Sequence, residues 1–170
     1  MKPNAIIYKS NTDYTKQYAE LLGKKTELPV YSLEEAMRRK VSDRSVIFLG
    51  WLMAGKVQGY KKAAKRYNIA AVCGVGMGAT GSQLQDVQKA NILPPSMPVF
   101  TLQGGFDMKR LRGVYKLMMT IMSKTAGKML SEKKDRTPDE DDMLDLLLHG
   151  GNRVSEENLA AVLDWYQKEQ

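Results

Sequence analysis

Short apolar runs alternate with helical patterns through the first 130 residues of the chain. The runs predicted to form strands are Ala5–Tyr8, Pro29–Tyr31, Ser45–Leu49, Ile69–Cys73 and Pro98–Leu102. Helical spacing of apolar and charged residues predicts helices over 14–23, 33–39, 56–67, 82–90 and 108–130. Strands that alternate with helices favour βαβ units, whose crossovers are right-handed.

The pattern therefore predicts an α/β fold with a doubly wound, five-stranded parallel sheet of strand order 2-1-3-4-5. Residues Val46 to Leu49 are apolar without interruption, as expected for a central strand buried on both faces. Ligands of such sheets bind beyond the carboxyl ends of the strands, near the switch point of the strand order. The loops after Tyr8, Leu49, Cys73 and Leu102 are expected to surround one site.

The first of these loops carries hydroxyl and amide side chains at the start of a helix. It reads Ser10-Asn11-Thr12-Asp13-Tyr14-Thr15. Such side chains, over the free N–H groups of a helix start, suit a phosphate group. The alternative is plain helix capping by Thr12 or Asp13.

Residues Ile6 to Thr15 resemble the FMN phosphate-binding signature of the flavodoxin family, in which a hydrophobic strand precedes S/T-x-T-G-x-T. Ser10, Thr12 and Thr15 match the hydroxyl positions, and Asp13 stands where the family usually has glycine. Aspartate tolerates positive φ better than most residues, but its charge weakens phosphate binding unless it points to solvent. The resemblance implies FMN as cofactor, with the phosphate held by Ser10, Asn11, Thr12, Tyr14 and Thr15.

The second loop is predicted over Gly50–Gly55, where two glycines bracket an apolar and aromatic segment. The flavodoxin resemblance implies that this loop lies on the isoalloxazine ring, with Trp51 at the ring. The alternative is that Trp51 and Leu52 pack under a neighbouring loop. The predicted contacts are Gly50, Trp51, Leu52, Met53, Ala54 and Gly55.

The third loop is rich in glycine and contains Gly76-x-Gly78-x-x-Gly81, the spelling of a dinucleotide fingerprint. That fingerprint belongs to the first βα turn, whereas this one follows the fourth strand. The next strand is also followed by Gln103 rather than by a ribose-binding carboxylate. We therefore interpret the loop as backbone close to the flavin, with contacts at Gly74, Val75, Gly76, Met77 and Gly78.

Charge divides the chain into a basic body and an acidic tail. Residues 1–134 carry 23 Lys/Arg and 9 Asp/Glu, and residues 135–170 carry 3 and 10. We predict an FMN-binding domain over 1–134 and an acidic helical extension over 135–170 that packs on the same domain. A basic body favours an anionic partner.

The predicted helix over 108–130 is basic and rich in methionine. Its apolar positions are Leu111, Val114, Tyr115, Met118, Met122 and Met129. We favour core packing of this stripe; the alternative is contact with anionic lipid. A Gly104-Gly105 loop before such a helix resembles the protoporphyrinogen-oxidase branch of flavodoxin-like proteins, which implies oxidation of a porphyrinogen and transfer of electrons towards quinone at the membrane.

The remaining chemistry-bearing residues add little. His149 is the only histidine and lies beside two glycines, which favours a capping or surface role. Cys73 is the only cysteine, no signal peptide is evident, and both features favour the cytoplasm. No metal-ligand spacing occurs, and a nucleophile–histidine dyad is hard to build.

The sequence thus leads to a hypothesis of an FMN-binding redox protein that transfers electrons. Its partners would be a redox protein or a small anionic substrate, with peripheral contact at the inner face of the membrane and no nucleic acid. The alternative is a flavodoxin-fold binding module without flavin or catalytic activity.

Overall fold

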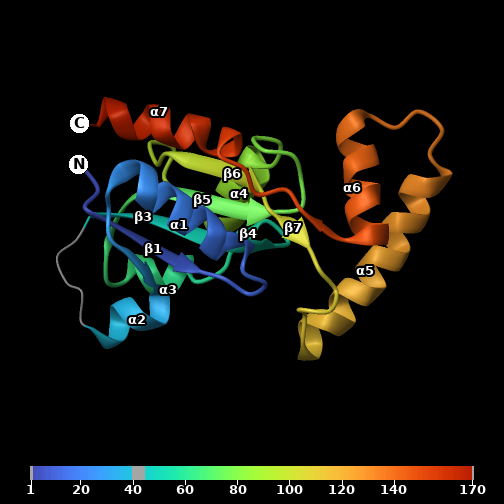
Figure 1. Cartoon of the computed structure of the whole chain (residues 1–170), viewed down its shortest axis with the longest axis horizontal. Coiled ribbons are helices and arrows are strands. Elements are labelled where there is room, and N and C mark those ends of the chain that lie inside the picture. Colours follow the sequence, from blue (N-terminus) through green and yellow to red (C-terminus); the bar gives the residue numbers. More distant parts are fainter. Residues whose placement is uncertain (1, 40–44, 170) are drawn as a thin grey trace.

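A mostly parallel β-sheet forms the centre of the molecule, and helices lie on both of its faces (Figure 1). The computed structural model describes residues 2–39 and 45–169. The neighbouring strands, in order, are β2 (Val30–Ser32), β1 (Ala5–Lys9), β3 (Ser45–Met53), β5 (Asn68–Gly76) and β6 (Val99–Gln103). Each of these strands pairs in parallel with its neighbour. The predicted α/β class with a parallel sheet is confirmed.

The sheet is buried on both faces because successive strand residues point to opposite sides. On one face Ile6, Ile47 and Leu49 pack with α1 (Tyr14–Thr26) and α7 (Ala160–Lys168). On the other face Ile7, Val46 and Phe48 pack with residues of α2 (Leu33–Arg38), α3 (Tyr60–Ala64) and α4 (Leu84–Asn91). A short 3-10 helix, η1 (Glu157–Leu159), leads into α7.

The segment predicted as a loop over Gly50–Gly55 is a β-hairpin, so that prediction is wrong. β3 continues through Met53, and β4 (Lys56–Val57) returns antiparallel to it. Ala54 and Gly55 both have positive φ, which is typical of the tightest hairpin turns. The helix predicted from residue 56 therefore begins only at Tyr60.

Two antiparallel helices project from the sheet as a helical arm (Figure 1). They are α5 (Gly113–Glu132) and α6 (Pro138–His149), and they pack against each other. Before and after them, β7 (Gly105–Phe106) pairs antiparallel with β8 (Gly151–Asn152), which fixes both ends of the arm at one place. α5 starts five residues later than predicted, because a turn occupies residues 108–110.

Most of the methionine-rich stripe of α5 faces solvent, so the core packing that the sequence favoured is wrong for Val114, Met118, Met122 and Met129. It is confirmed for Leu111 and Tyr115, which pack with Phe106 and Leu146. The exposed members of this face are Val114 (62%), Leu117 (62%), Met118 (46%), Ile121 (59%), Met122 (54%) and Met129 (69%). Within the described helix only Gly127 is buried. The reason is that α5 leaves the sheet and packs on α6, which covers a different side of the helix.

Candidate functional site

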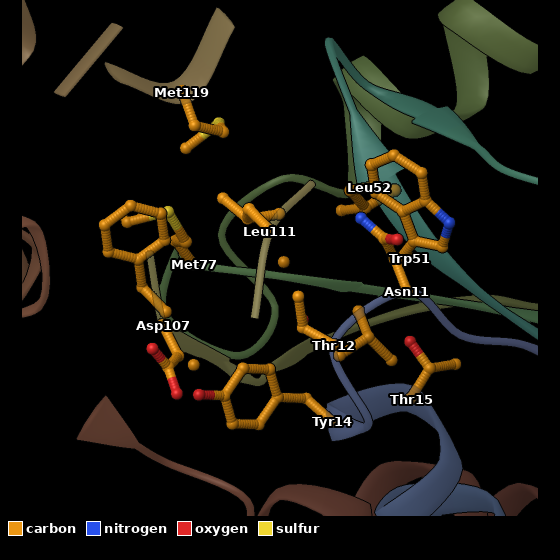
Figure 2. A pocket seen from close by; sticks show the side chains of 14 residues that line it. Asn11, Thr12, Tyr14, Thr15, Trp51, Leu52, Met77, Asp107, Leu111 and Met119 are labelled. Carbon is orange, nitrogen blue, oxygen red and sulfur yellow. The ribbon is translucent and has the colours of Figure 1, made fainter. Parts of the chain in front are cut away.

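A pocket lies at the carboxyl ends of β1, β3 and β5, where the sequence predicts a site (Figure 2). Its cavity volume is about 100 Å³, which is smaller than the ~300–1,000 Å³ of typical small-molecule sites. The lining residues are Asn11, Thr12, Tyr14, Thr15, Trp51, Leu52, Val75, Gly76, Met77, Gly105, Phe106, Asp107, Leu111 and Met119.

One side of the pocket is the loop between β1 and α1. Asp13 adopts the left-handed conformation there, with φ of 71°. Asp13 does not cap α1 with its side chain, and the first-turn N–H groups of a helix have no partner within the helix. The capping alternative is therefore wrong for Asp13.

Two hydroxyl-bearing side chains of this loop, Ser10 and Thr15, are withdrawn from solvent. The Oγ atom of Ser10 is buried and has no hydrogen-bond partner among the described residues. Thr15 is only 1% exposed and lines the pocket. A buried polar atom without a partner costs free energy, so such atoms often mark a place that a ligand or water completes.

The charge of Asp13 is balanced from across the pocket. Arg110, in the turn that precedes α5, places Nη1 3.2 Å from Oδ2 of Asp13 and 3.3 Å from the carbonyl oxygen of Thr12. Asp107 lies 3.3 Å from Nε of the same guanidinium. The Asp13 side chain is 64% exposed.

The rest of the pocket is apolar and aromatic. Trp51 and Leu52 line it from the end of β3, and Met77 lies opposite them (Figure 2). The Trp51 ring meets the edge of Tyr115 on α5, with ring centroids 5.3 Å apart and planes at 89°. The helical arm therefore touches the pocket as well as the sheet.

Nine of the sixteen sequence-predicted site residues line this pocket. The residues outside the lining are Ser10, Gly50, Met53, Ala54, Gly55, Gly74 and Gly78. Gly55 instead packs on α4, where Nδ2 of Asn91 donates to its carbonyl oxygen at 2.9 Å. A Cβ atom at Gly74 would lie 2.7 Å from Leu52, so this glycine serves close packing between β3 and β5.

Several lining residues were not among the predicted contacts. They are Gly105, Phe106, Asp107, Leu111 and Met119. The first three lie in the segment after Leu102, which the sequence places around the site without naming its contact residues. Leu111, which is 8% exposed, and Met119 reach the pocket only because the chain turns back over it, which no local pattern indicates.

Titratable groups near the pocket suit binding better than acid–base chemistry. Burial, and then the Asp107 carboxylate, raise the pKa of Tyr14, so its hydroxyl stays protonated at neutral pH. Burial raises the pKa of the Cys73 thiol to about 12, which keeps it from acting as a nucleophile. Within residues 2–39 and 45–169, no cluster of three His, Cys, Asp or Glu side chains could hold a metal ion.

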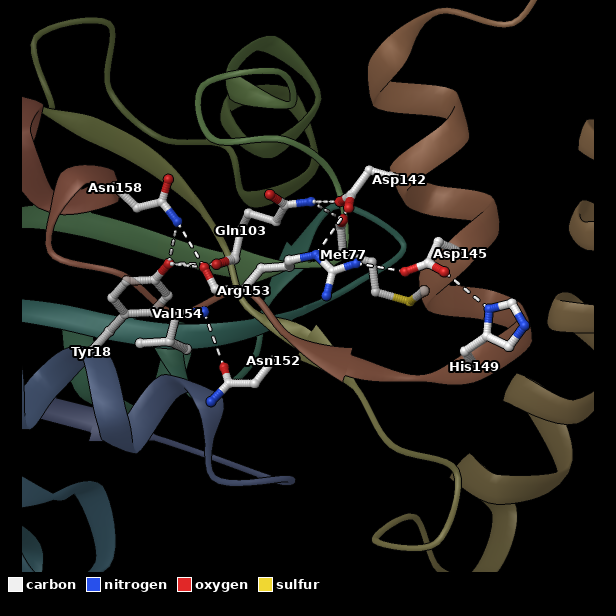
Figure 3. A network of polar contacts seen from close by, with 10 residues as sticks. All are labelled: Tyr18, Met77, Gln103, Asp142, Asp145, His149, Asn152, Arg153, Val154 and Asn158. Atoms are coloured by element: carbon white, nitrogen blue, oxygen red, sulfur yellow. Dashed lines mark hydrogen bonds and ion pairs between the residues drawn. The ribbon is translucent and has the colours of Figure 1, made fainter.

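A polar network next to the pocket fixes the base of the arm (Figure 3). Arg153 donates to Asp142 at 2.9 Å and to Asp145 at 2.7 Å, both on α6. Gln103, at the end of β6, donates to Asp142 at 2.5 Å. His149 is exposed and hydrogen-bonds to Asp145, which together with Arg153 lowers the pKa of that carboxyl. The predicted surface role of His149 is confirmed.

Comparison with known proteins assigns no family to the chain. No family model, curated protein or solved structure matches it. In the described part of the chain, no helix is both long and apolar enough to cross a lipid bilayer. The class that the fold defines is an α/β protein with a mostly parallel sheet and a pocket at the strands' carboxyl edge.

Proposed function

We propose that this chain is a flavodoxin-like redox protein that binds FMN in the pocket at the carboxyl edge of its sheet. The observation that carries the proposal is the β1–α1 loop, where the buried Ser10 hydroxyl lacks a partner beside an apolar, aromatic pocket. The strand order β2-β1-β3-β5-β6 also supports it, because ligands bind at the switch point of such sheets.

The residues present fit the two ends of FMN. Ser10, Thr12 and Thr15 would hold the phosphate, together with the first-turn N–H groups of α1. Trp51, Leu52 and Met77 would contact the isoalloxazine ring, which needs an apolar surface of this kind. When bound, FMN would supply two-electron chemistry, which none of the chain's own side chains supplies.

The chain's residues would orient the ring and exclude water from it. Met119 lines the pocket from the arm, Leu111 lines it from the segment before the arm, and Trp51 borders it from β3. The protonated Tyr14 hydroxyl beside Asp107 is available as a hydrogen-bond donor at the pocket wall.

An anionic substrate suits the basic body of residues 1–134, and the resemblance to the protoporphyrinogen-oxidase branch suggests a porphyrinogen. Each oxidation would remove two electrons and two protons from the substrate and convert a quinone acceptor to a quinol. Protoporphyrinogen oxidation by the FMN-loaded chain, with a quinone present, tests this assignment. If the chain oxidises the porphyrinogen no faster than free FMN does, the result would favour an electron carrier that acts on a protein partner.

The exposed face of α5 suits a peripheral contact with an anionic membrane surface. Lys124 and Lys128 flank its apolar side chains, and Glu132 is its only acidic residue. A second copy of α5 would bring like charges together, whereas anionic lipid complements them. We propose contact at the inner face of the cytoplasmic membrane.

Ile121→Asp should abolish sedimentation of the chain with vesicles containing phosphatidylglycerol, because a charge in the apolar face opposes insertion. Leu148→Asp is the matched control, since Leu148 is 63% exposed on α6 and outside this face. Equal sedimentation of the wild type with purely zwitterionic vesicles, or of both variants with anionic ones, would contradict the proposal.

Ser10→Ala should weaken FMN binding on the order of tenfold, because the lost hydroxyl is a donor to a charged phosphate. The same change should leave the free protein equally stable or stabilise it by up to about 1 kcal/mol, because it removes a buried atom without a partner. Quenching of FMN fluorescence and urea unfolding measure the two effects.

Ser123→Ala is the matched control for that experiment. Its Oγ atom is also buried without a partner, but it lies on α5 away from the loop. It should shift stability in the same direction and leave FMN affinity unchanged. A Ser10→Ala variant that binds FMN as tightly as the wild type would count against a phosphate at this loop.

A further inference from the structure

Arg110, in the turn before the arm, contacts the candidate phosphate loop at Asp13, 97 residues away in the sequence. It lies in the turn that follows β7, and its guanidinium reaches the loop at Asp13 and Thr12. The next residue, Leu111, is 8% exposed and lines the pocket. One short segment therefore contributes a cation near the loop and an apolar side chain to the pocket.

The guanidinium keeps donors available in this arrangement. Among the described residues its hydrogen bonds use Nη1 alone, towards Asp13 and the Thr12 carbonyl. Nε of Arg110 lies 3.3 Å from Oδ2 of Asp107 in an ion pair. The Arg110 side chain is 49% exposed. A planar guanidinium with several donors matches the oxygens of a phosphate group.

Asp13 accounts for the position of this arginine. An exposed ion pair contributes little to the free energy of unfolding, so the pair between Arg110 and Asp13 adds little to the stability of the fold. Beside a phosphate dianion, an unpaired aspartate would repel the ligand. Paired with Arg110, it becomes the anchor that holds a cation at the rim of the loop.

We propose that Arg110 binds the phosphate monoester of the ligand and that Asp13 positions its guanidinium for that contact. The inference rests on the proposed FMN site and adds a residue that recognises the phosphate rather than the ring. It also couples the ligand to the arm, because Arg110 and Leu111 precede α5 directly. Binding of the phosphate would thus hold the pocket's cover in place.

The test compares FMN with riboflavin, which has the same ring and lacks the phosphate. Arg110→Gln should weaken FMN binding roughly tenfold to a hundredfold, since it removes a charge-assisted hydrogen bond. It should change riboflavin affinity little. The FMN affinity of Arg110→Lys should lie between that of the wild type and that of Arg110→Gln, because lysine keeps the charge and loses the planar donors. Flavin fluorescence measures all affinities, and thermal unfolding checks that each variant is folded.

Arg112→Gln is the matched control, because Arg112 is exposed, two residues away and carries the same charge. It should leave the preference for FMN over riboflavin unchanged. An Arg110→Gln variant that binds FMN as well as the wild type, or loses both ligands equally, overturns the role of Arg110 and leaves the flavin site standing. A wild-type chain that binds neither ligand overturns the proposed function as well.

Discussion

Replacing Tyr18 with alanine should lower the free energy of unfolding by about 3–5 kcal/mol, the usual cost of deleting a buried aromatic ring. Tyr18 is fully buried on α1, where it packs with Leu22 and Ile47 in one of the two cores. Its hydroxyl donates to the carbonyl oxygen of Gln103 and accepts from Nδ2 of Asn158 at 2.7 Å. The side chain thus joins α1, the end of β6 and the segment before α7 (Figure 3). Urea unfolding followed by circular dichroism measures the loss.

Tyr18→Phe separates the hydroxyl from the ring. It should cost about 1–2 kcal/mol, because it leaves the Gln103 carbonyl without its donor while Asn158 keeps a bond to the Arg153 carbonyl at 2.9 Å. The prediction for alanine is wrong if that variant unfolds within about 1 kcal/mol of the wild type.

Trp51→Ala should weaken FMN binding roughly tenfold to a hundredfold, since stacking on an aromatic side chain contributes about 1–3 kcal/mol. The change also removes the edge contact with Tyr115, so the arm loses one of its contacts at the pocket. Fluorescence titration with FMN gives the affinity.

Trp165→Ala is the matched control, because Trp165 is the only other tryptophan. It lies on α7 and packs against Phe100, with ring centroids 6.0 Å apart, outside the pocket lining. It should reduce stability and leave FMN affinity unchanged. Equal affinities for FMN in both tryptophan variants would remove Trp51 from the proposed ring contact.

The parallel sheet could be predicted because its central strands are apolar on both faces. Val46 to Leu49 and Ala71 to Cys73 have that character, and both runs are buried. The hairpin after β3 could not, because Gly50 and Gly55 marked a loop by composition. Gly50 is paired within the sheet, with Lys9 and Gly74 as its neighbours, so its role is close packing.

The α5 helix shows what helical periodicity cannot predict about the burial of an apolar face. Its apolar stripe predicted that the face is covered, but helical periodicity does not say by what. The pairing of β7 with β8 sets the direction in which the arm leaves the sheet, and two-residue strands carry no detectable pattern. The exposure of Ile121 and Met122 follows from that distant pairing rather than from α5 itself.

The site residues likewise differ in whether a local sequence pattern could predict them. The β1–α1 loop could be located from a local motif, and even the left-handed turn at Asp13 was anticipated. Arg110, Leu111 and Met119 could not, since they reach the loop and pocket through the long-range path of the chain. The proposed phosphate contacts come from residues that are local in sequence, whereas Leu111 and Met119 reach the pocket from a distant part of the chain.

Equilibrium dialysis of the purified chain against FMN, followed by an absorption spectrum of the protein chamber, tests the central claim most directly. We expect one FMN to be retained per chain, with visible bands shifted from those of free FMN and fluorescence that returns on denaturation. FMN at equal concentration on both sides of the dialysis membrane, with an unshifted spectrum, would contradict FMN binding by this chain.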